Sequence, residues 1–324
     1  MDAFKPYPLK KQSRLYRQFP SLRRYNPFSV KQAGWILFGP SILPSHLEHI
    51  SFYLGEDVEP VAGWTVADHT VLLMPGTLNP DIEEICQAIE LDYASVDCLP
   101  ELDQPGLAVF DMDSTAIQIE CIDEIAALAG VGEQVSEVTE RAMQGELDFE
   151  QSLRERVAAL KGADMAILTQ VRDSLPLMPG MGQLVATLKH FGWKVAIASG
   201  GFTWFSDKLK QDLQLDHAES NQLVIDGNVL SGELTGNIVD AQRKADILRE
   251  LADKFDIPAT NTIAVGDGAN DLVMMASAGL GIAFHAKPKV EAQAQAAVRF
   301  SDLVGVACIL SASLIKTGQL SLKG

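Results

Sequence analysis

Two carboxylates and two hydroxyls stand close together near residue 110. The apolar run Leu107–Phe110 leads directly into Asp111 and Asp113, and Ser114 and Thr115 follow them. In an extended backbone the side chains at positions i and i+2 point to the same side, so both carboxylates can face one site. A buried strand that ends in paired acids is where open α/β sheets place ligands. The alternative is a strand followed by a turn whose hydroxyl caps a helix.

A second polar group begins at residue 199. The predicted strand Lys194–Ala198 runs into Ser199, Gly200 and Gly201 at the start of a predicted helix. A hydroxyl and two glycines at that point expose backbone N–H groups at the positive end of the helix, which suits a phosphate. A glycine-rich turn with Ser199 as its cap is the alternative interpretation.

A third group follows the predicted strand Thr262–Val265. The sequence there is Gly-Asp-Gly-Ala-Asn-Asp, in which Asp267 and Asp271 bracket the first turn of the next helix. Carboxylates that converge at one sheet edge raise each other's pKa unless a cation lies among them. A set of oxygen ligands, with waters and a substrate phosphate, suits Mg²⁺ better than zinc. We therefore expect a site for one magnesium ion.

A lysine is also expected near such a site, because a bound phosphate carries negative charge that the metal does not neutralise. Lys244, in the predicted helix Ala241–Phe255, is the candidate. The alternative is an ordinary helix lysine that points into solvent.

From residue 180 onward, the elements that carry these groups alternate between helices and strands. This alternation predicts a parallel, doubly wound α/β sheet. The predicted helices are Met181–Phe191, Phe202–Leu213, Ala241–Phe255 and Asp271–Ala278, and the predicted strands are Leu107–Phe110, Lys194–Ala198, Thr262–Val265 and Leu280–Ala283.

The segment from Glu120 to Leu175 is almost wholly helical in pattern. A block of this length is too long for a simple connection between a strand and a helix, so it predicts a lid inserted after the first strand. Further along, Asp226, Gly227 and Asn228 lie between two short strand-like runs and predict a hairpin that projects as a flap.

The residues before the acidic linker Pro100–Pro105 predict a separate α+β unit. Its elements are expected in the order strand, helix, strand, strand, helix, strand, which is that of the ferredoxin-like fold. In topology it resembles the small regulatory ACT domains. The predicted strands are Gly34–Phe38, Val61–Val66, His69–Met74 and Ala94–Leu99, and the predicted helices are Pro44–Leu54 and Asn79–Ala88.

The composition restricts the partners of the chain. The formal net charge of −17 argues against general binding to nucleic acids or to anionic membranes. The first 31 residues are the exception, with eight lysines and arginines against one acid, and we interpret residues 1–33 as a solvated basic arm that packs on the acidic body rather than a transit peptide. The four cysteines form no paired motif and fit as small buried side chains in a reducing cytoplasm.

The three groups and the lysine follow one another in the motif order of the haloacid-dehalogenase-like (HAD-like) phosphatases. All four motifs are present, and the chain is therefore identified as similar to that family. The resemblance is closer to its phosphoserine phosphatases and covers about residues 107–300. It rests on Asp-Met-Asp-Ser-Thr with Glu120, Phe149-Glu-Gln-Ser-Leu-Arg-Glu-Arg-Val, Ser-Gly-Gly-Phe and Gly-Asp-Gly-Ala-Asn-Asp.

This resemblance implies a Mg²⁺-dependent hydrolysis of O-phospho-L-serine, the last step of serine biosynthesis. Asp111 is then the nucleophile that forms an aspartyl-phosphate, and Asp113 is the general acid and base. The metal ligands are the side chains of Asp111 and Asp267 and the carbonyl of Asp113, with Asp271 orienting them.

The resemblance also implies which residues bind the substrate. Glu120 meets the ammonium group, and Arg156 holds the carboxylate in a bidentate fork. The full expected set is Glu120, Met143, Phe149, Arg156, Ser199, Gly200, Lys244 and Asn270. The expected partner is thus a small molecule, and a homodimer is possible.

The domain organisation that follows has four parts. They are the arm 1–33, the ferredoxin-like or ACT-like unit 34–100, a HAD-like core of residues 101–118 and 177–324, and a helical cap of residues 119–176. Three alternatives remain at this point: a phosphatase or phosphotransferase for another small phosphomonoester, a signalling receiver that retains its phosphate, and a front unit that binds serine as a regulator.

Overall fold

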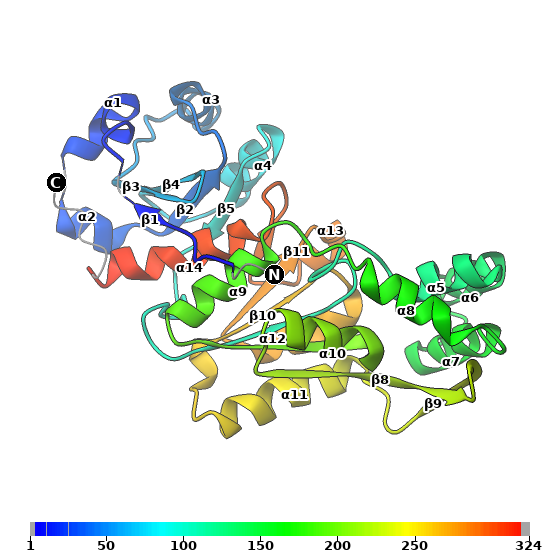
Figure 1. Ribbon diagram of the computed structural model, residues 1–324. Coiled ribbons are helices and arrows are strands. Elements are labelled where there is room, and N and C mark those ends of the chain that lie inside the picture. The colour runs from blue at the N-terminus through cyan, green and yellow to red at the C-terminus, as the bar shows by residue number, and fades with distance from the viewer. Residues whose placement is uncertain (1–3, 11, 25, 319–324) are drawn as a thin grey trace.

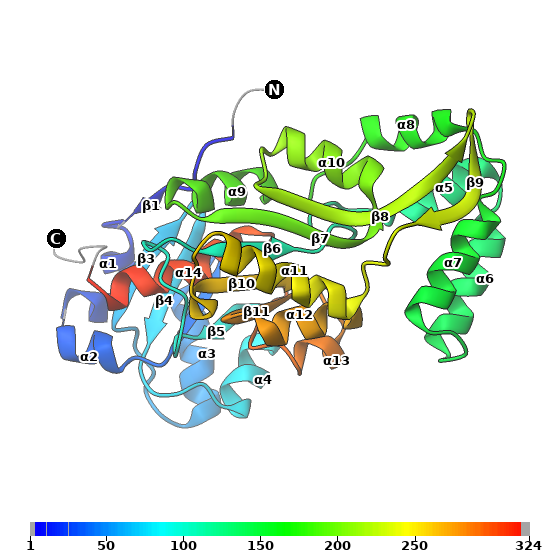
Figure 2. The ribbon, with the colours of Figure 1, turned by 90° about the horizontal axis from the view of Figure 1, so that it is seen from below.

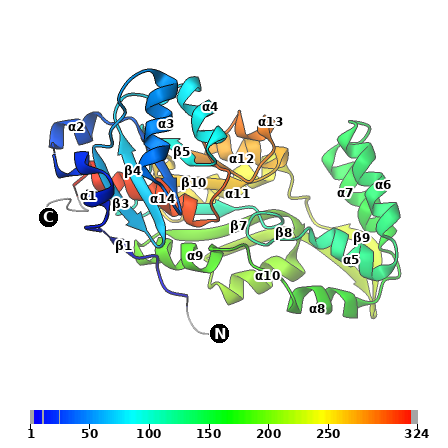
Figure 3. The same cartoon turned by 90° about the horizontal axis from the view of Figure 1, so that it is seen from above.

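The computed structural model describes residues 4–10, 12–24 and 26–318. They form two β-sheets with covering helices and a helical cap at the end remote from the smaller sheet, as Figures 1 and 3 show. Among these residues no helix is long and apolar enough to cross a bilayer.

The larger sheet has seven strands in the order β12-β11-β10-β6-β7-β8-β9. All neighbours are parallel except β8 and β9, which form an antiparallel hairpin. The doubly wound α/β prediction is therefore confirmed. The strands are β6 (Leu107–Phe110), β7 (Lys194–Phe202), β8 (His217–Asp226), β9 (Val229–Thr235), β10 (Thr262–Gly266), β11 (Leu280–Phe284) and β12 (Ala296–Val298).

Alternate residues of β6 enter the two hydrophobic layers that cover this sheet. Leu107 and Val109 pack in the layer that includes helices α11 and α12, whereas Ala108 and Phe110 pack in the layer that includes α9, α10 and α14. Figure 2 shows α9 and α10 on one face and α11, α12 and α13 on the other. These helices are α9 (Met181–His190), α10 (Thr203–Asp212), α11 (Ala241–Lys254), α12 (Leu272–Ser277), α13 (Pro288–Glu291) and α14 (Val304–Lys316).

The cap follows β6 directly and consists of four helices. They are α5 (Cys121–Ala129), α6 (Gly132–Met143), α7 (Phe149–Ala159) and α8 (Met165–Asp173). The β8–β9 hairpin is longer than the sequence pattern predicts and reaches the cap (Figure 2), where Leu230 exchanges backbone hydrogen bonds with Gly162 and Ala163 between α7 and α8. The predicted flap is thus tied to the cap.

The smaller sheet is antiparallel, with the strand order β1-β3-β4-β2-β5. Strands β2 to β5, with helices α3 and α4, follow the expected βαββαβ order, and β1 adds an edge strand. The elements are β1 (Leu9–Lys10), α1 (Leu15–Gln18), η1 (Pro20–Arg23), α2 (Pro27–Gln32), β2 (Trp35–Gly39), α3 (Pro44–Leu54), β3 (Ala62–Val66), β4 (His69–Met74), α4 (Pro80–Ala88) and β5 (Asp92–Ser95).

Two expectations about this part of the chain need correction. The basic segment is not a solvated arm throughout, because Leu15, Phe19 and Leu22 are buried against the small sheet and its helices. The last strand ends at Ser95 rather than Leu99, and Cys98 lies beyond it in a turn with a positive φ of 58°. That cysteine is exposed and is not a buried hydrophobe as the composition suggested.

Helix α14 joins the two sheets, and no pattern in the sequence predicted it. Twelve of its thirteen residues are buried, as expected for a helix that is apolar on every side. Its Ser311 hydroxyl accepts a buried hydrogen bond of 2.8 Å from the Trp64 indole in the small sheet. At Gly305 an added Cβ would lie 2.7 Å from Val298 and 3.3 Å from Phe38, so the helix approaches both sheets closely there.

A single carboxylate also links β5 to the larger sheet. Asp92 is 1% exposed, and its oxygens accept hydrogen bonds from the backbone N–H groups of Arg299, at 2.7 Å, and Ser301, at 2.8 Å. The Phe300 N–H lies 3.3 Å from both oxygens. These donors are in the segment that follows β12, so Asp92 holds the two sheets together.

We expect the substitution Asp92→Ala to lower the free energy of unfolding by about 2–4 kcal/mol, because it leaves buried N–H groups without acceptors. Chemical denaturation followed by circular dichroism measures this change. Asp97→Ala is the control, since Asp97 is exposed just beyond the same strand and should change stability by less than about 0.5 kcal/mol. Equal effects of the two substitutions would contradict the linking role of Asp92.

Candidate functional site

A pocket of about 300 Å³ lies where the carboxyl ends of β6, β7 and β10 meet the cap. Both the core and the cap contribute side chains to it. The lining residues are Asp111, Asp113, Glu120, Ile122, Phe149, Leu153, Arg156, Ser199, Gly200, Gly201, Phe202, Asp267, Ala269 and Asn270. Nine of the twelve predicted site residues are in this set. Lys244 and Asp271 are buried behind Asp111, where the Lys244 ammonium contacts both carboxylates.

Asp111 and Asp113 face this pocket from the end of β6, while Met112 between them is fully buried in the core. The Asp111 N–H continues the sheet by donating to the Val265 carbonyl of β10 at 2.9 Å. Asp113 accepts a hydrogen bond of 3.1 Å from the N–H of Cys121, the first residue of α5. The alternation expected from the i and i+2 spacing is therefore present.

The loop at the end of β7 presents Ser199 and two glycines to the same pocket. The Ser199 hydroxyl oxygen accepts a hydrogen bond of 2.9 Å from the Gly201 N–H, which leaves the hydroxyl proton available to donate. An added Cβ at Gly200 would lie 2.8 Å from the Phe149 ring, and one at Gly201 would lie 2.6 Å from an Asp113 oxygen. A side chain at either position would have to displace Phe149 or Asp113.

The third group closes the pocket from β10. Asp267 accepts a hydrogen bond of 3.0 Å from the Thr115 hydroxyl. Asp271 is fully buried, and one of its oxygens accepts from the Gly268 N–H at 3.0 Å. One carboxylate oxygen each of Asp111, Asp267 and Asp271 lie within 4.8 Å of one another.

Lys244 is the cation within this acidic group. Its side chain is fully buried, and its ammonium lies 2.9 Å from an Asp111 oxygen and 2.8 Å from an Asp271 oxygen. Burial disfavours the charged form, but Asp111 and Asp271 outweigh burial and raise the pKa of Lys244. The alternative of a solvated helix lysine is therefore wrong.

The carboxylates are not neutralised by this one lysine. Burial, followed by the charge of Asp271, raises the pKa of Asp111 well above its usual range and that of Asp267 to about 6. Burial and the charge of Glu120 raise the pKa of Asp113 to about 7. Because the pKa values of several carboxylates are raised in one pocket, a further cation would bind there favourably. All the donor atoms are oxygens, which fits a hard divalent ion.

The cap supplies one acid and one base to the pocket. Glu120 stands just before α5 and accepts a hydrogen bond of 2.7 Å from the Ser114 hydroxyl. Arg156, from α7, has a buried Nε with no hydrogen-bond partner among the described residues. Burial lowers the pKa of Arg156, and the nearby charges of Asp123 and Glu120 oppose this change. A guanidinium whose buried Nε lacks an acceptor is a group that an anion would stabilise.

Met143 is the predicted site residue that the structure does not bring to the pocket. It is the last residue of α6, next to the exposed residues 144–146, and its side chain is 69% exposed. Conversely, Ile122, Leu153 and Phe202 line the pocket but were not predicted. Their apolar side chains carry no chemical signal in the sequence.

Comparisons with known proteins agree with this geometry. Residues 106–279 match the haloacid dehalogenase-like hydrolase family, and residues 31–95 match a domain family of unknown function. The chain is 58% identical to a phosphoserine phosphatase of Vibrio cholerae over 100% of this chain and 98% of that one. It is 51% identical to a phosphoserine phosphatase of Haemophilus influenzae over 92% of this chain and 95% of that one.

Solved structures give the same result. A crystal structure of a probable phosphoserine phosphatase from Vibrio cholerae, in unliganded form, superposes with a TM-score of 0.92 at 57% identity and covers 100% of both chains. A substrate-bound phosphoserine phosphatase complex gives a TM-score of 0.60 at 39% identity and covers 63% of this chain and 97% of that one. These findings set aside a signalling receiver: the chain belongs to the phosphoserine phosphatase family of the haloacid dehalogenase-like hydrolases.

Proposed function

We propose that the chain hydrolyses O-phospho-L-serine to L-serine and inorganic phosphate. The observation that carries the proposal is the cap pair Arg156 and Glu120, which lines the same pocket as Asp111. Arg156 can bind a carboxylate and Glu120 an ammonium group, while the core binds the phosphate. A phosphomonoester without an amino-acid end would leave the buried Arg156 Nε without an acceptor.

In the proposed first step an Asp111 oxygen attacks phosphorus, and the bond to the serine oxygen breaks. Asp113 gives its proton to that oxygen, for which its raised pKa of about 7 is suited. The Ser199 hydroxyl, the Gly200 N–H and Lys244 would bind the oxygens of the transferring group, with Asn270 at the same site. In the second step Asp113, now ionised, takes a proton from water, which attacks the aspartyl-phosphate and releases phosphate.

We propose Mg²⁺ as the cofactor, one ion per site. The side chains of Asp111 and Asp267 and the carbonyl of Asp113 would hold it, and Asp271, fixed by Lys244 and Gly268, would orient them. A bound Mg²⁺ would supply positive charge to the phosphate oxygens. The proximity of the carboxylate oxygens and their raised pKa values support this assignment.

We further propose that residues 119–176 act as a lid over the core formed by residues 101–118 and 177–324, while residues 34–100 form the front unit. Phe149 and Leu153 of α7 lie over the catalytic loops, where closure would exclude water from the aspartyl-phosphate.

We also propose that the protein is located in the cytoplasm.

The substitution Asp111→Asn should abolish turnover, with at least about a thousandfold loss of kcat, because an amide is not a nucleophile toward phosphorus. Release of inorganic phosphate from phosphoserine measures the loss, and circular dichroism checks that the fold is retained. Activity close to that of the unchanged enzyme would refute Asp111 as the nucleophile.

Arg156→Ala should raise KM for phosphoserine by about 10- to 1,000-fold, since it removes the partner of the substrate carboxylate. The KM for p-nitrophenyl phosphate, which has no carboxylate, should change by less than about threefold. Arg154→Ala is the matched control, because Arg154 lies on the same helix but forms only an exposed pair with Glu150. Equal changes for both substrates would count against the substrate assignment.

Metal removal should make stability depend on pH in a defined direction. In the metal-free protein Asp113 and Asp267 have pKa values of about 7 and 6, above the value of about 3.9 in an unfolded chain. The folded state therefore binds more protons, and stability falls as pH rises from about 4 to 7. Mg²⁺ should consequently raise Tm more at pH 8 than at pH 5.

Thermal unfolding of EDTA-treated protein, with and without Mg²⁺ at matched ionic strength, tests this expectation. Asp267→Asn should remove most of the Mg²⁺ effect at pH 8. An Mg²⁺-induced rise in Tm of equal size at both pH values would show that the carboxylates are not the metal ligands.

A further inference from the structure

The catalytic loop at the end of β7 leaves the regular ladder of the sheet. Ala198 pairs with Glu219 and Phe202 pairs with Asn221, and the register shifts between these pairs. Three residues of β7, numbers 199–201, therefore stand opposite one residue of β8, Ser220. Two of the three are glycines, which have little conformational preference of their own, so this loop needs an external restraint to keep one geometry.

The side chain of Asn221 supplies such a restraint. It is 1% exposed, and its amide nitrogen donates a hydrogen bond of 2.8 Å to the Gly200 carbonyl. The N–H of the same peptide group belongs to Gly201 and donates to the Ser199 hydroxyl oxygen at 2.9 Å. Holding the carbonyl end of this planar group therefore also fixes the direction of its N–H, and with it the Ser199 hydroxyl.

The other end of the Asn221 amide holds the segment that carries the lysine. Its oxygen accepts a hydrogen bond of 2.8 Å from the Val239 N–H. Val239 directly precedes Asp240, which caps α11 through the Arg243 N–H, and the Lys244 N–H donates to the Asp240 carbonyl at 2.9 Å. One buried amide thus connects the phosphate loop of β7 to the helix that delivers Lys244.

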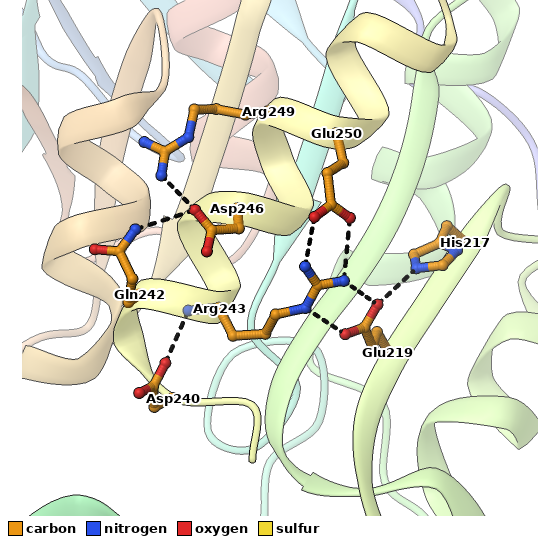
Figure 4. Close-up of polar contacts among 8 residues, drawn as sticks. All are labelled: His217, Glu219, Asp240, Gln242, Arg243, Asp246, Arg249 and Glu250. Carbon is orange, nitrogen blue, oxygen red and sulfur yellow. Dashed lines mark hydrogen bonds and ion pairs between the residues drawn. The ribbon is translucent and has the colours of Figure 1, made fainter. Parts of the chain in front are cut away.

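A second contact from β8 holds the same helix. Figure 4 shows Arg243 between Glu219 and Glu250, and its Nε and Nη2 lie 2.7 and 3.0 Å from the Glu219 oxygens. Glu219 and Asn221 are two residues apart on one strand, so both side chains reach the same face. The ion pair is partly exposed, at 29% and 30% for the two side chains, whereas the Asn221 amide is buried and has no water to replace its partners.

We propose that Asn221 is a positioning residue for the reaction. It sets the relative placement of the Ser199 hydroxyl, the Gly200–Gly201 peptide and Lys244 without touching the substrate. This inference rests on the proposed function only in that a phosphoryl group is bound by this loop and this lysine. It assigns no role in recognising the amino-acid end of the substrate, because Glu120 and Arg156 are not among the partners of Asn221.

The test compares Asn221→Asp and Asn221→Ala with the unchanged enzyme. Asp is nearly isosteric and keeps the acceptor for the Val239 N–H, but it cannot donate to the Gly200 carbonyl. We expect both variants to lose about 10- to 100-fold in kcat per folded molecule, as is typical when a group that orients catalytic residues is removed. The loss should be equal for phosphoserine and p-nitrophenyl phosphate, since both place a phosphoryl group in the same loop.

Asn261 provides a matched control. It is also buried, at 6%, and its amide also makes two backbone hydrogen bonds to a distant segment, donating to the Pro105 carbonyl at 2.8 Å and accepting from the Glu101 N–H at 2.6 Å. It directly precedes β10 and therefore lies at the opposite end of the strands from the pocket. Asn261→Ala should lower Tm about as much as Asn221→Ala and leave kcat within about twofold.

The outcomes separate the two proposals. A kcat of Asn221→Asp within twofold of the unchanged enzyme on both substrates overturns the positioning role, as does an equal loss of kcat in the Asn221 and Asn261 variants. Turnover of p-nitrophenyl phosphate without turnover of phosphoserine by the unchanged enzyme refutes the proposed substrate, while the comparison of variants still tests Asn221.

Discussion

The structure of the site depends on how four carboxylates share one small volume. Asp111, Asp267 and Asp271 bring carboxylate oxygens within 4.8 Å of one another at the carboxyl edge of the sheet, and Asp113 lines the same pocket. The fully buried Lys244 contacts two of them, Asp111 and Asp271. Negative charge of this density is unfavourable in a buried place unless cations and hydrogen-bond donors balance it. The loops of β7 and β10 and the start of α11 must therefore converge on β6 with little freedom. This excess of negative charge makes it costly for all the carboxylates to ionise when no metal is bound. It therefore also favours the binding of a divalent cation.

The cap presents the opposite electrostatic situation, because there a positive group lacks a partner. Among the described residues the buried Arg156 Nε has no acceptor, and burial lowers the pKa of this side chain. The core thus holds negative charge, and the cap a guanidinium, that the described residues do not fully satisfy. A ligand that carries a phosphate at one end and a carboxylate at the other would satisfy the cap through its carboxylate and bind the core through Lys244 and the proposed divalent cation. Complementarity of this kind gives selectivity as well as affinity, since a ligand that lacks one end leaves a buried charge unpaired.

The sequence predicted those parts of the fold in which the hydrophobic pattern and the functional residues indicate the same structure. Strand Leu107–Phe110 has the predicted bounds, and Asp111, Asp113, Ser199 and Asp267 are in one pocket as expected. Features that depend on packing against distant parts of the chain were not predicted. Helix α14 shows no amphipathic pattern because both sheets bury it, and the exposure of Met143 depends on how the end of α6 packs. Asn221 gave no signal because a buried asparagine with two backbone partners resembles any strand or turn asparagine until the distant Gly200 and Val239 are placed beside it.

Helix α14 also has a consequence for how the protein is made. The small sheet is complete by Ser95, and one face of it, which includes Phe38 and Trp64, is covered by a helix that begins at Val304. At a synthesis rate of about 5–20 residues per second, roughly ten to forty seconds pass between the two. During that time this apolar face has no native cover. The front sheet is therefore synthesised well before the helix that covers it, and its apolar face is exposed on the nascent chain until α14 has been made.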